Sequence, residues 1–192
     1  MVVAWQKRRL EAGATMSEIP GENQVVAVNP FVAADVVEVL RARGLAELSA
    51  EQTAWCERAA FLLGPQVTDR DGLADLLGLV FEYDAARALN DVEAHNVMAR
   101  YAARDVIRML ARLVLGGGAC TPERFSEIVT ALKTELDIRG RELFHPLRLA
   151  LAGRSGEGEL DRVILLVDAA AEAGFAVKTV RERMVEFCSV ME

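Results

Sequence analysis

Apolar residues recur along most of the chain at the three- and four-residue spacing of amphipathic helices. Residues that start and stop helices separate these segments. Ser49 with Gln52 has the pattern of a capping box, and Thr121 before Pro122 is typical of a helix start. Helices are therefore predicted over approximately residues 30–43, 50–63, 69–80, 84–89, 91–114, 122–136, 146–152, 159–172 and 176–190.

The pattern predicts an all-α protein. Only the stretch Gln24–Val28 is compatible with a strand, because no other segment combines sustained two-residue alternation with turn signals. The glycines 116–118 end the longest predicted helix and form a link between two helical subdomains. The expected organisation is an N-terminal extension over residues 1–29, a helical subdomain over 30–118 and a C-terminal helical subdomain over 119–192.

Composition narrows the class of protein. The chain has 192 residues, of which 52% are hydrophobic and 27% charged, as in an ordinary globular protein. Its longest uncharged run, Asn23–Ala34, is shorter than the roughly 20 residues of a membrane-spanning helix. No apolar segment typical of a secretory signal follows the basic residues near the N-terminus. The three cysteines are widely spaced, which favours a reducing, cytoplasmic location.

Few residues offer catalytic or metal chemistry. Two histidines and three cysteines without ligand spacing predict no metal site. The triple glycine is not a phosphate loop, because Ala119 and Cys120 follow it instead of lysine and serine or threonine. We therefore expect neither a cofactor nor an enzymatic activity. His145, which precedes Pro146, is expected at a helix entrance.

Basic residues form two local groups in a chain whose net charge is −7. Arg100, Arg104, Arg108 and Arg112 repeat every four residues on the predicted 91–114 helix. This row is either a stripe that faces phosphates or a solvated face that pairs with the acids of neighbouring helices. The second group, between residues 139 and 154, has four arginines and one acid.

The second group carries the most specific sequence signal. Its sequence is Arg-Gly-Arg-Glu-Leu-Phe-His-Pro-Leu-Arg-Leu-Ala-Leu-Ala-Gly-Arg, and Gly158-Glu159-Leu160 follows. We interpret it as a turn, a helix started by Pro146 and a stop at Gly153. The segment resembles the C-terminal anticodon-binding region of bacterial glutamyl-tRNA synthetases, which has a Gly-Lys/Arg-x-Leu-Phe-x-Pro-Leu-Arg-x-Ala-Leu-Thr-Gly-Arg stretch followed by Gly-Pro-x-Leu. A weaker resemblance extends over roughly residues 30–190.

The resemblance implies an all-helical anticodon-binding fold, an α-helical cage of two subdomains. It also implies that Arg148 and Leu160 lie where the family contacts anticodon bases. The sequence departs from the family at two places: Ala152 replaces a threonine, and Glu157-Gly158 replaces Gly-Pro, which adds a negative charge at the anticodon side. The family's HIGH-like and KMSKS-like motifs are absent, so we expect no aminoacylation by this chain.

Two functions remain open at this point. The first is a non-catalytic module that binds tRNA or another structured RNA. The second is a divergent copy that has lost RNA binding and docks a protein partner, which the net charge and Glu157 favour. A continuous positive groove would support the first, and arginines held in ion pairs would support the second. The candidate RNA-binding residues are Arg104, Arg108, Arg141, Arg148, Arg154 and Leu160.

Overall fold

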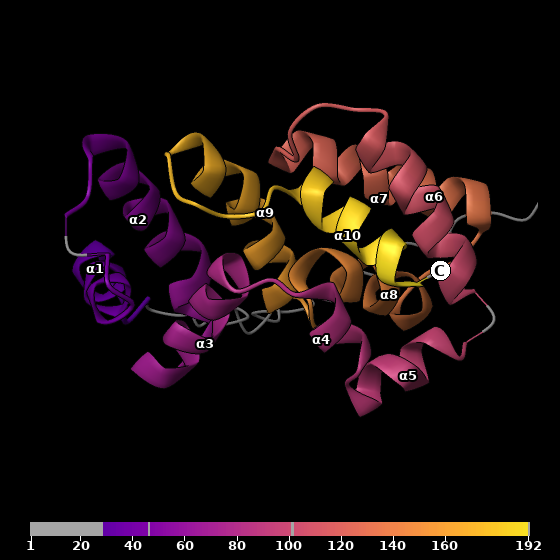
Figure 1. Cartoon of the computed structure of the whole chain (residues 1–192), viewed down its shortest axis with the longest axis horizontal. Helices are drawn as coiled ribbons and strands as arrows, with labels where there is room; N and C mark the ends of the chain where they lie inside the picture. Colours follow the sequence, from indigo (N-terminus) through magenta and orange to yellow (C-terminus); the bar gives the residue numbers. More distant parts are fainter. Residues whose placement is uncertain (1–28, 46, 101, 192) are drawn as a thin grey trace, which may run out of the picture.

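The computed structural model describes residues 29–45, 47–100 and 102–191. Within them the chain forms ten α-helices, one short 3-10 turn and no strand, which confirms the all-α prediction (Figure 1). The candidate strand Gln24–Val28 and the predicted N-terminal extension up to residue 28 lie outside the described residues. The helices are α1 (Ala33–Ala42), α2 (Ala50–Leu63), α3 (Arg70–Phe81), α4 (Ala85–Leu89), α5 (Val92–Met98), α6 (Ala103–Leu115), α7 (Pro122–Leu136), α8 (Arg141–Ala152), α9 (Glu159–Glu172) and α10 (Val180–Met191).

Several predicted helix ends are confirmed by the hydrogen bonds that cap them. The hydroxyl of Ser49 accepts a bond from the Gln52 amide, and the Gln52 side chain accepts one from the Ser49 amide in return. Thr121 caps α7, whose first residue is Pro122. At the end of α8, Gly153 has a φ of 81°, a left-handed conformation that glycine adopts without strain.

The longest predicted helix is in fact two helices. α5 ends at Met98 and α6 begins at Ala103, so Arg100 lies in the connection and only Arg104, Arg108 and Arg112 lie on α6. Two predicted starts are also early: α1 begins at Ala33 and α10 at Val180. In both cases a side chain three residues on accepts a bond from the backbone before the helix, Asp35 at the first and Glu182 at the second.

The prediction that Pro146 starts a helix is wrong. α8 begins five residues earlier at Arg141, and Pro146 lies inside it. Gly140, with a φ of 59°, turns the chain after α7, and its carbonyl accepts bonds from the amides of Leu143 and Phe144. Proline costs one backbone hydrogen bond inside a helix. The apolar face of α8 is almost fully buried and offsets that loss.

The buried side chains form one continuous hydrophobic core. α9 lies at its centre, in contact with α2, α3 and α8. Trp55, Phe81 and Phe175 meet edge to face, with ring centroids 5.0–5.7 Å apart. The indole of Trp55 also donates a 3.1 Å bond to the carbonyl of Leu166 on α9. Helices from both predicted subdomains thus share the core, and the boundary near residue 118 stays a prediction.

None of the described helices has the length and apolar character needed to cross a bilayer.

Candidate functional site

Arg148 is the centre of the candidate site, and it is buried rather than exposed. It lies on α8 with 6% of its surface accessible. Its Nε and Nη2 donate bonds of 2.7 and 2.8 Å to the two carboxylate oxygens of Asp161 on α9. Its Nη1 donates a 2.6 Å bond to the carbonyl of Gly156. The guanidinium therefore joins α8, the loop 153–158 and α9.

The second residue expected to contact a base, Leu160, is fully buried in the first turn of α9. Gly156 packs closely over it: a Cβ at that glycine would lie 3.0 Å from the Leu160 Cδ1. In this structure neither Arg148 nor Leu160 faces solvent as a base-contacting side chain would. The role of each in base contact stays a prediction.

Two other candidate arginines lie at the surface around the same loop, and each is paired with a carboxylate. Arg141, at the start of α8, lies 3.2 Å from Glu157, and both side chains are about two-thirds or more exposed, at 73% and 67%. Arg154, just after α8, lies 2.7 Å from Asp75 on α3. Glu157 thus opposes the positive charge of this region, as its sequence position suggests.

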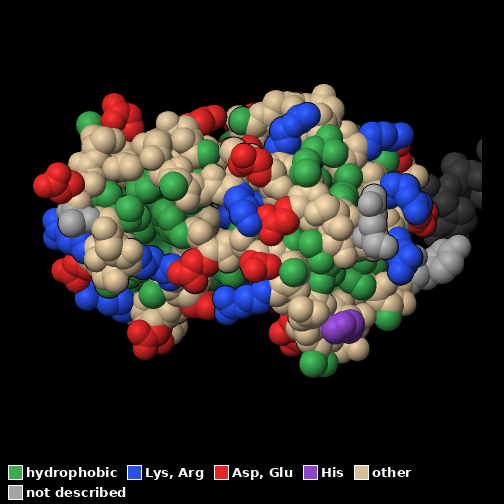
Figure 2. All heavy atoms as spheres, in the orientation of Figure 1, with side chains coloured by type: hydrophobic (Ala, Val, Ile, Leu, Met, Phe, Trp, Pro, Cys, Tyr) green, Lys and Arg blue, Asp and Glu red, His purple; other side chains and the backbone are tan. Residues whose placement is uncertain are grey.

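The arginines of α6 do not all fit one interpretation of the row, because some are ion-paired with carboxylates and one is not. Arg108 pairs with Asp105 of its own helix at 2.9 Å, and Arg112 pairs with Glu135 of α7 at 2.9 Å. Arg104 is exposed and forms no ion pair with any described residue. On the face shown in Figure 2, acidic side chains lie among the basic ones in the centre and at the left, and several basic side chains gather at the right end.

A basic hollow that sequence reasoning missed lies where α7 turns into α8. It has a volume of about 520 Å³ and is lined by Lys133, Thr134, Asp137, Arg139, Gly140 and Phe144. The ring of Phe144 has the ammonium of Lys133 5.4 Å from its centroid and the guanidinium of Arg148 4.8 Å from it. Neither Lys133 nor Arg139 has an ion pair among the residues that the structure describes. The sequence signal for this hollow is weak, because Lys133 and Arg139 belong to different elements.

A larger groove, of about 940 Å³, lies between α3, α4, α5 and the end of α8. Its charged lining has five acids and three bases: Asp75, Glu82, Asp84, Asp91, Glu93, Arg43, Arg87 and Arg154. Two of these bases are ion-paired, Arg43 with Glu82 and Arg154 with Asp75. The lining also includes Val92, whose side chain is 76% exposed. The groove therefore combines an acidic excess with an exposed apolar side chain.

His145 lies inside α8, not at a helix entrance, and its Nε2 is buried without a hydrogen-bond partner among the described residues. Burial lowers the pKa of its imidazole, and the positive charges of Arg100, Arg141 and Arg148 lower it further, while Glu157 acts in the opposite direction.

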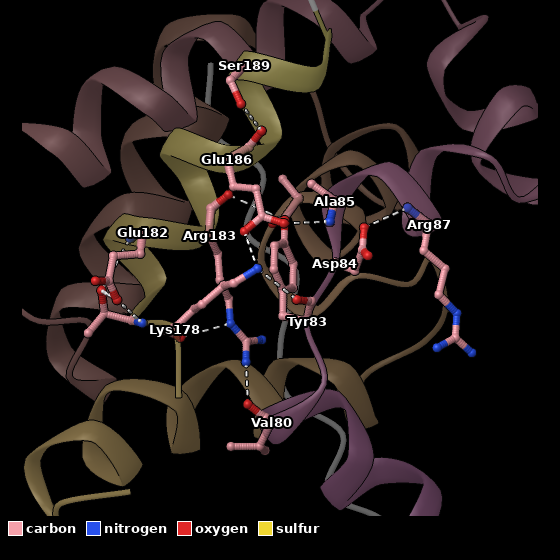
Figure 3. A network of polar contacts seen from close by, with 12 residues as sticks. Val80, Tyr83, Asp84, Ala85, Arg87, Lys178, Glu182, Arg183, Glu186 and Ser189 are labelled. Carbon is pink, nitrogen blue, oxygen red and sulfur yellow. Dashed lines mark hydrogen bonds and ion pairs between the residues drawn. The ribbon is translucent and has the colours of Figure 1, made fainter. Parts of the chain in front are cut away.

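Behind the candidate site, a buried polar network joins α3, α8 and α10 (Figure 3). Arg183 has no accessible surface and donates to the carbonyls of Val80, Leu151 and Lys178 at 2.6, 2.9 and 3.1 Å. Its guanidinium lies 4.7 Å from the ring centroid of Tyr83. Burial lowers the pKa of Arg183 to about 10. Sequence reasoning missed this residue, although it stands between the apolar positions Val180, Met184 and Phe187.

Together the fold and the site define a helical module in which a buried arginine holds a surface loop. Comparison with known proteins adds that the chain is similar to a region of glutamate–tRNA ligases. It is 28% identical over 116 residues to glutamate–tRNA ligase 2 of Syntrophus aciditrophicus (strain SB), which covers 60% of this chain and 23% of that protein. It is 26% identical over 121 residues to glutamate–tRNA ligase of Bacillus velezensis, which covers 63% of this chain and 24% of that protein.

The alignments span about a quarter of the length of these curated relatives. No family model matches the chain, and no solved structure matches it. The findings therefore relate the chain to part of the glutamate–tRNA ligases.

Proposed function

We propose that the protein is a non-catalytic module that binds tRNA or another structured RNA. The observation that carries this proposal is the loop 153–158, held from beneath by Arg148 and flanked at the surface by Arg141 and Arg154. The similarity to glutamate–tRNA ligases supports RNA as the ligand.

The ion pairs of Arg141 and Arg154 do not prevent phosphate binding. Exposed ion pairs typically contribute about 0.2–1 kcal/mol, so a phosphate can replace a carboxylate at low cost. Arg104 and the basic hollow with Lys133 and Arg139 need no such exchange. We propose that these exposed cations contact RNA phosphates together with Arg108, and that the loop 153–158 sets their position.

The proposal is tested by titrating labelled bulk tRNA with the full chain at two salt concentrations. Each phosphate contact adds roughly 0.7–0.9 to the slope of log affinity against log salt. Arg154→Ala should weaken binding to all RNAs to a similar extent and flatten that slope. The matched control is Arg41→Ala on α1, an exposed arginine outside the proposed contacts, and it should retain wild-type binding.

A protein partner is the second candidate function, and the ion pairing of the arginines favours it. Four of the five candidate arginines are paired with carboxylates: Arg108, Arg141, Arg148 and Arg154. The acidic groove with the exposed Val92 offers a surface for a basic, partly apolar segment of such a partner. If the wild-type chain shows no salt-sensitive RNA binding at micromolar protein, the RNA proposal fails and the protein-docking function takes its place.

A further inference from the structure

The loop 153–158 contacts the rest of the protein mostly through exposed side chains, and Arg148 supplies the more buried hydrogen bond. Glycine occupies three of its six positions, 153, 156 and 158, and glycine has the largest conformational freedom of any residue. The loop is therefore costly to order unless side chains from the core hold it. The carbonyl of Gly156 receives such a contact, from the buried guanidinium of Arg148.

The whole guanidinium of Arg148 is used in contacts within the protein. The side chain is 7% exposed, its three nitrogens all donate to protein oxygens, and the ring of Phe144 lies 4.8 Å from its guanidinium carbon. A bidentate arginine–carboxylate pair is among the strongest hydrogen-bonded arrangements in proteins. To reach a base, Arg148 would have to leave Asp161 unpaired beneath the loop, and an unpaired, partly buried carboxylate is costly.

We propose that Arg148 is a positioning residue: it does not read a base, but holds the loop 153–158 in the shape that presents Arg154 to RNA. The inference rests on the proposed RNA binding. Asp161 shares this positioning role, because it orients the guanidinium of Arg148 toward the Gly156 carbonyl. Arg148 and Asp161 should therefore act together on the loop, and the loss of either should release it.

The variant Asp161→Asn separates this role from direct base contact, because the two roles predict opposite effects. If Arg148 positions the loop, the substitution weakens tRNA binding, as Arg148→Gln does, and the double variant is no worse than either single variant. If Arg148 contacts RNA, removal of its carboxylate partner frees the guanidinium and strengthens binding. Glu159→Gln, in the same first turn of α9, is the control for the loss of one negative charge.

Two readouts are needed on the full chain. The first is hydrogen exchange at the amides of residues 153–158, which should become several-fold faster in Asp161→Asn and Arg148→Gln and stay unchanged in Glu159→Gln. The second is affinity for two purified tRNAs that differ in their anticodons. A positioning role lowers the affinity for both to the same extent, so that their ratio is unchanged. A merely structural role would speed exchange without any change in affinity.

The outcomes distinguish this inference from the proposed function. Tighter binding in Asp161→Asn, a changed affinity ratio in Arg148→Gln alone, or unchanged loop exchange in both variants overturns the positioning role. If the wild-type chain binds neither tRNA, the proposed function is wrong. The exchange measurement then still decides whether Arg148 holds the loop. Asp161→Asn keeps the size of the side chain, which is 23% exposed, so it is the milder substitution and keeps the test available if Arg148→Gln fails to fold.

Discussion

Arg183 is a positive charge surrounded by backbone carbonyls. It satisfies oxygens at the end of α3, near the end of α8 and before α10, and it has no ion pair among the described residues. The carbonyl of Ala150 on α8 accepts a separate 2.6 Å bond from the Tyr83 hydroxyl. At the C-terminal ends of α3 and α8 these side chains satisfy carbonyl groups that water would satisfy at an exposed helix end. They fix the end of α8, from which the candidate loop begins.

Arg183→Met should lower the free energy of unfolding by about 3–5 kcal/mol, because it leaves two buried carbonyls and one partly buried carbonyl without donors. Chemical denaturation followed by the fluorescence of the buried Trp55 measures the change. Arg181→Met is the matched control: this neighbour is exposed and donates a single bond, to the Leu115 carbonyl. Its loss should cost less than about 1 kcal/mol. Equal losses in the two variants would contradict the role of the buried network.

His145 should make stability depend on pH. The folded protein holds the pKa of its imidazole below the usual value, so the unfolded chain takes up the proton first as the pH falls below about 6.5. Proton uptake then favours unfolding, and the free energy of unfolding should fall between pH 7 and pH 5. His145→Gln should lose less stability over that interval. An identical loss in wild type and His145→Gln would contradict the prediction.

At the scale of elements, the local sequence predicts the start of a helix well where the capping side chain bonds a backbone amide in the first turn of that helix. Ser49 and Thr121 mark their helices correctly because each hydroxyl accepts a bond from an amide only three residues on. Pro146 misleads because proline is common at helix starts but is tolerated inside α8. Buried contacts with other helices offset the backbone hydrogen bond that Pro146 cannot form. The local sequence does not reveal those contacts.

Leu151 tests how far α8 depends on that burial. The side chain is fully buried in the last turn of the helix, and the carbonyl of the same residue accepts a bond from Arg183. Leu151→Ala should lower the free energy of unfolding by about 2–5 kcal/mol, through lost apolar contact and the cavity that remains. Val92→Ala, at a side chain that is 76% exposed, is the control and should change stability by less than about 0.5 kcal/mol. An unchanged denaturation midpoint for Leu151→Ala would contradict the placement of α8 in the core.

At the scale of the whole molecule, the partners of the arginines decide what the site can bind, and sequence did not predict them. Arg154 and Asp75 are 79 residues apart in the chain, and Arg148 meets Asp161 only because α8 packs against α9. Sequence could locate the basic segment and the opposing Glu157. It could not predict that Arg148 and Leu160 are buried, because burial depends on how the helices assemble.

The net charge of −7 therefore acts on RNA binding through particular carboxylates. Glu157 and Asp75 each pair with an arginine that we propose contacts phosphate. An RNA phosphate must displace that carboxylate, which costs the roughly 0.2–1 kcal/mol of an exposed pair, and it is also repelled by the remaining charge. Glu157→Gln and Asp75→Asn should each tighten tRNA binding, by about 1.4- to 5-fold if the exposed pair is the only cost.

The measurement is the tRNA titration at low salt, with Glu38→Gln as control. Glu38 on α1 is also an exposed carboxylate paired with an arginine, but its partner Arg70 is not one of the proposed RNA contacts. The gain in affinity should shrink at higher salt, because screening weakens both the ion pair and the repulsion. If Glu38→Gln tightens binding as much as the other two variants do, RNA responds to net charge alone, and the assignment of Arg141 and Arg154 as contacts is refuted.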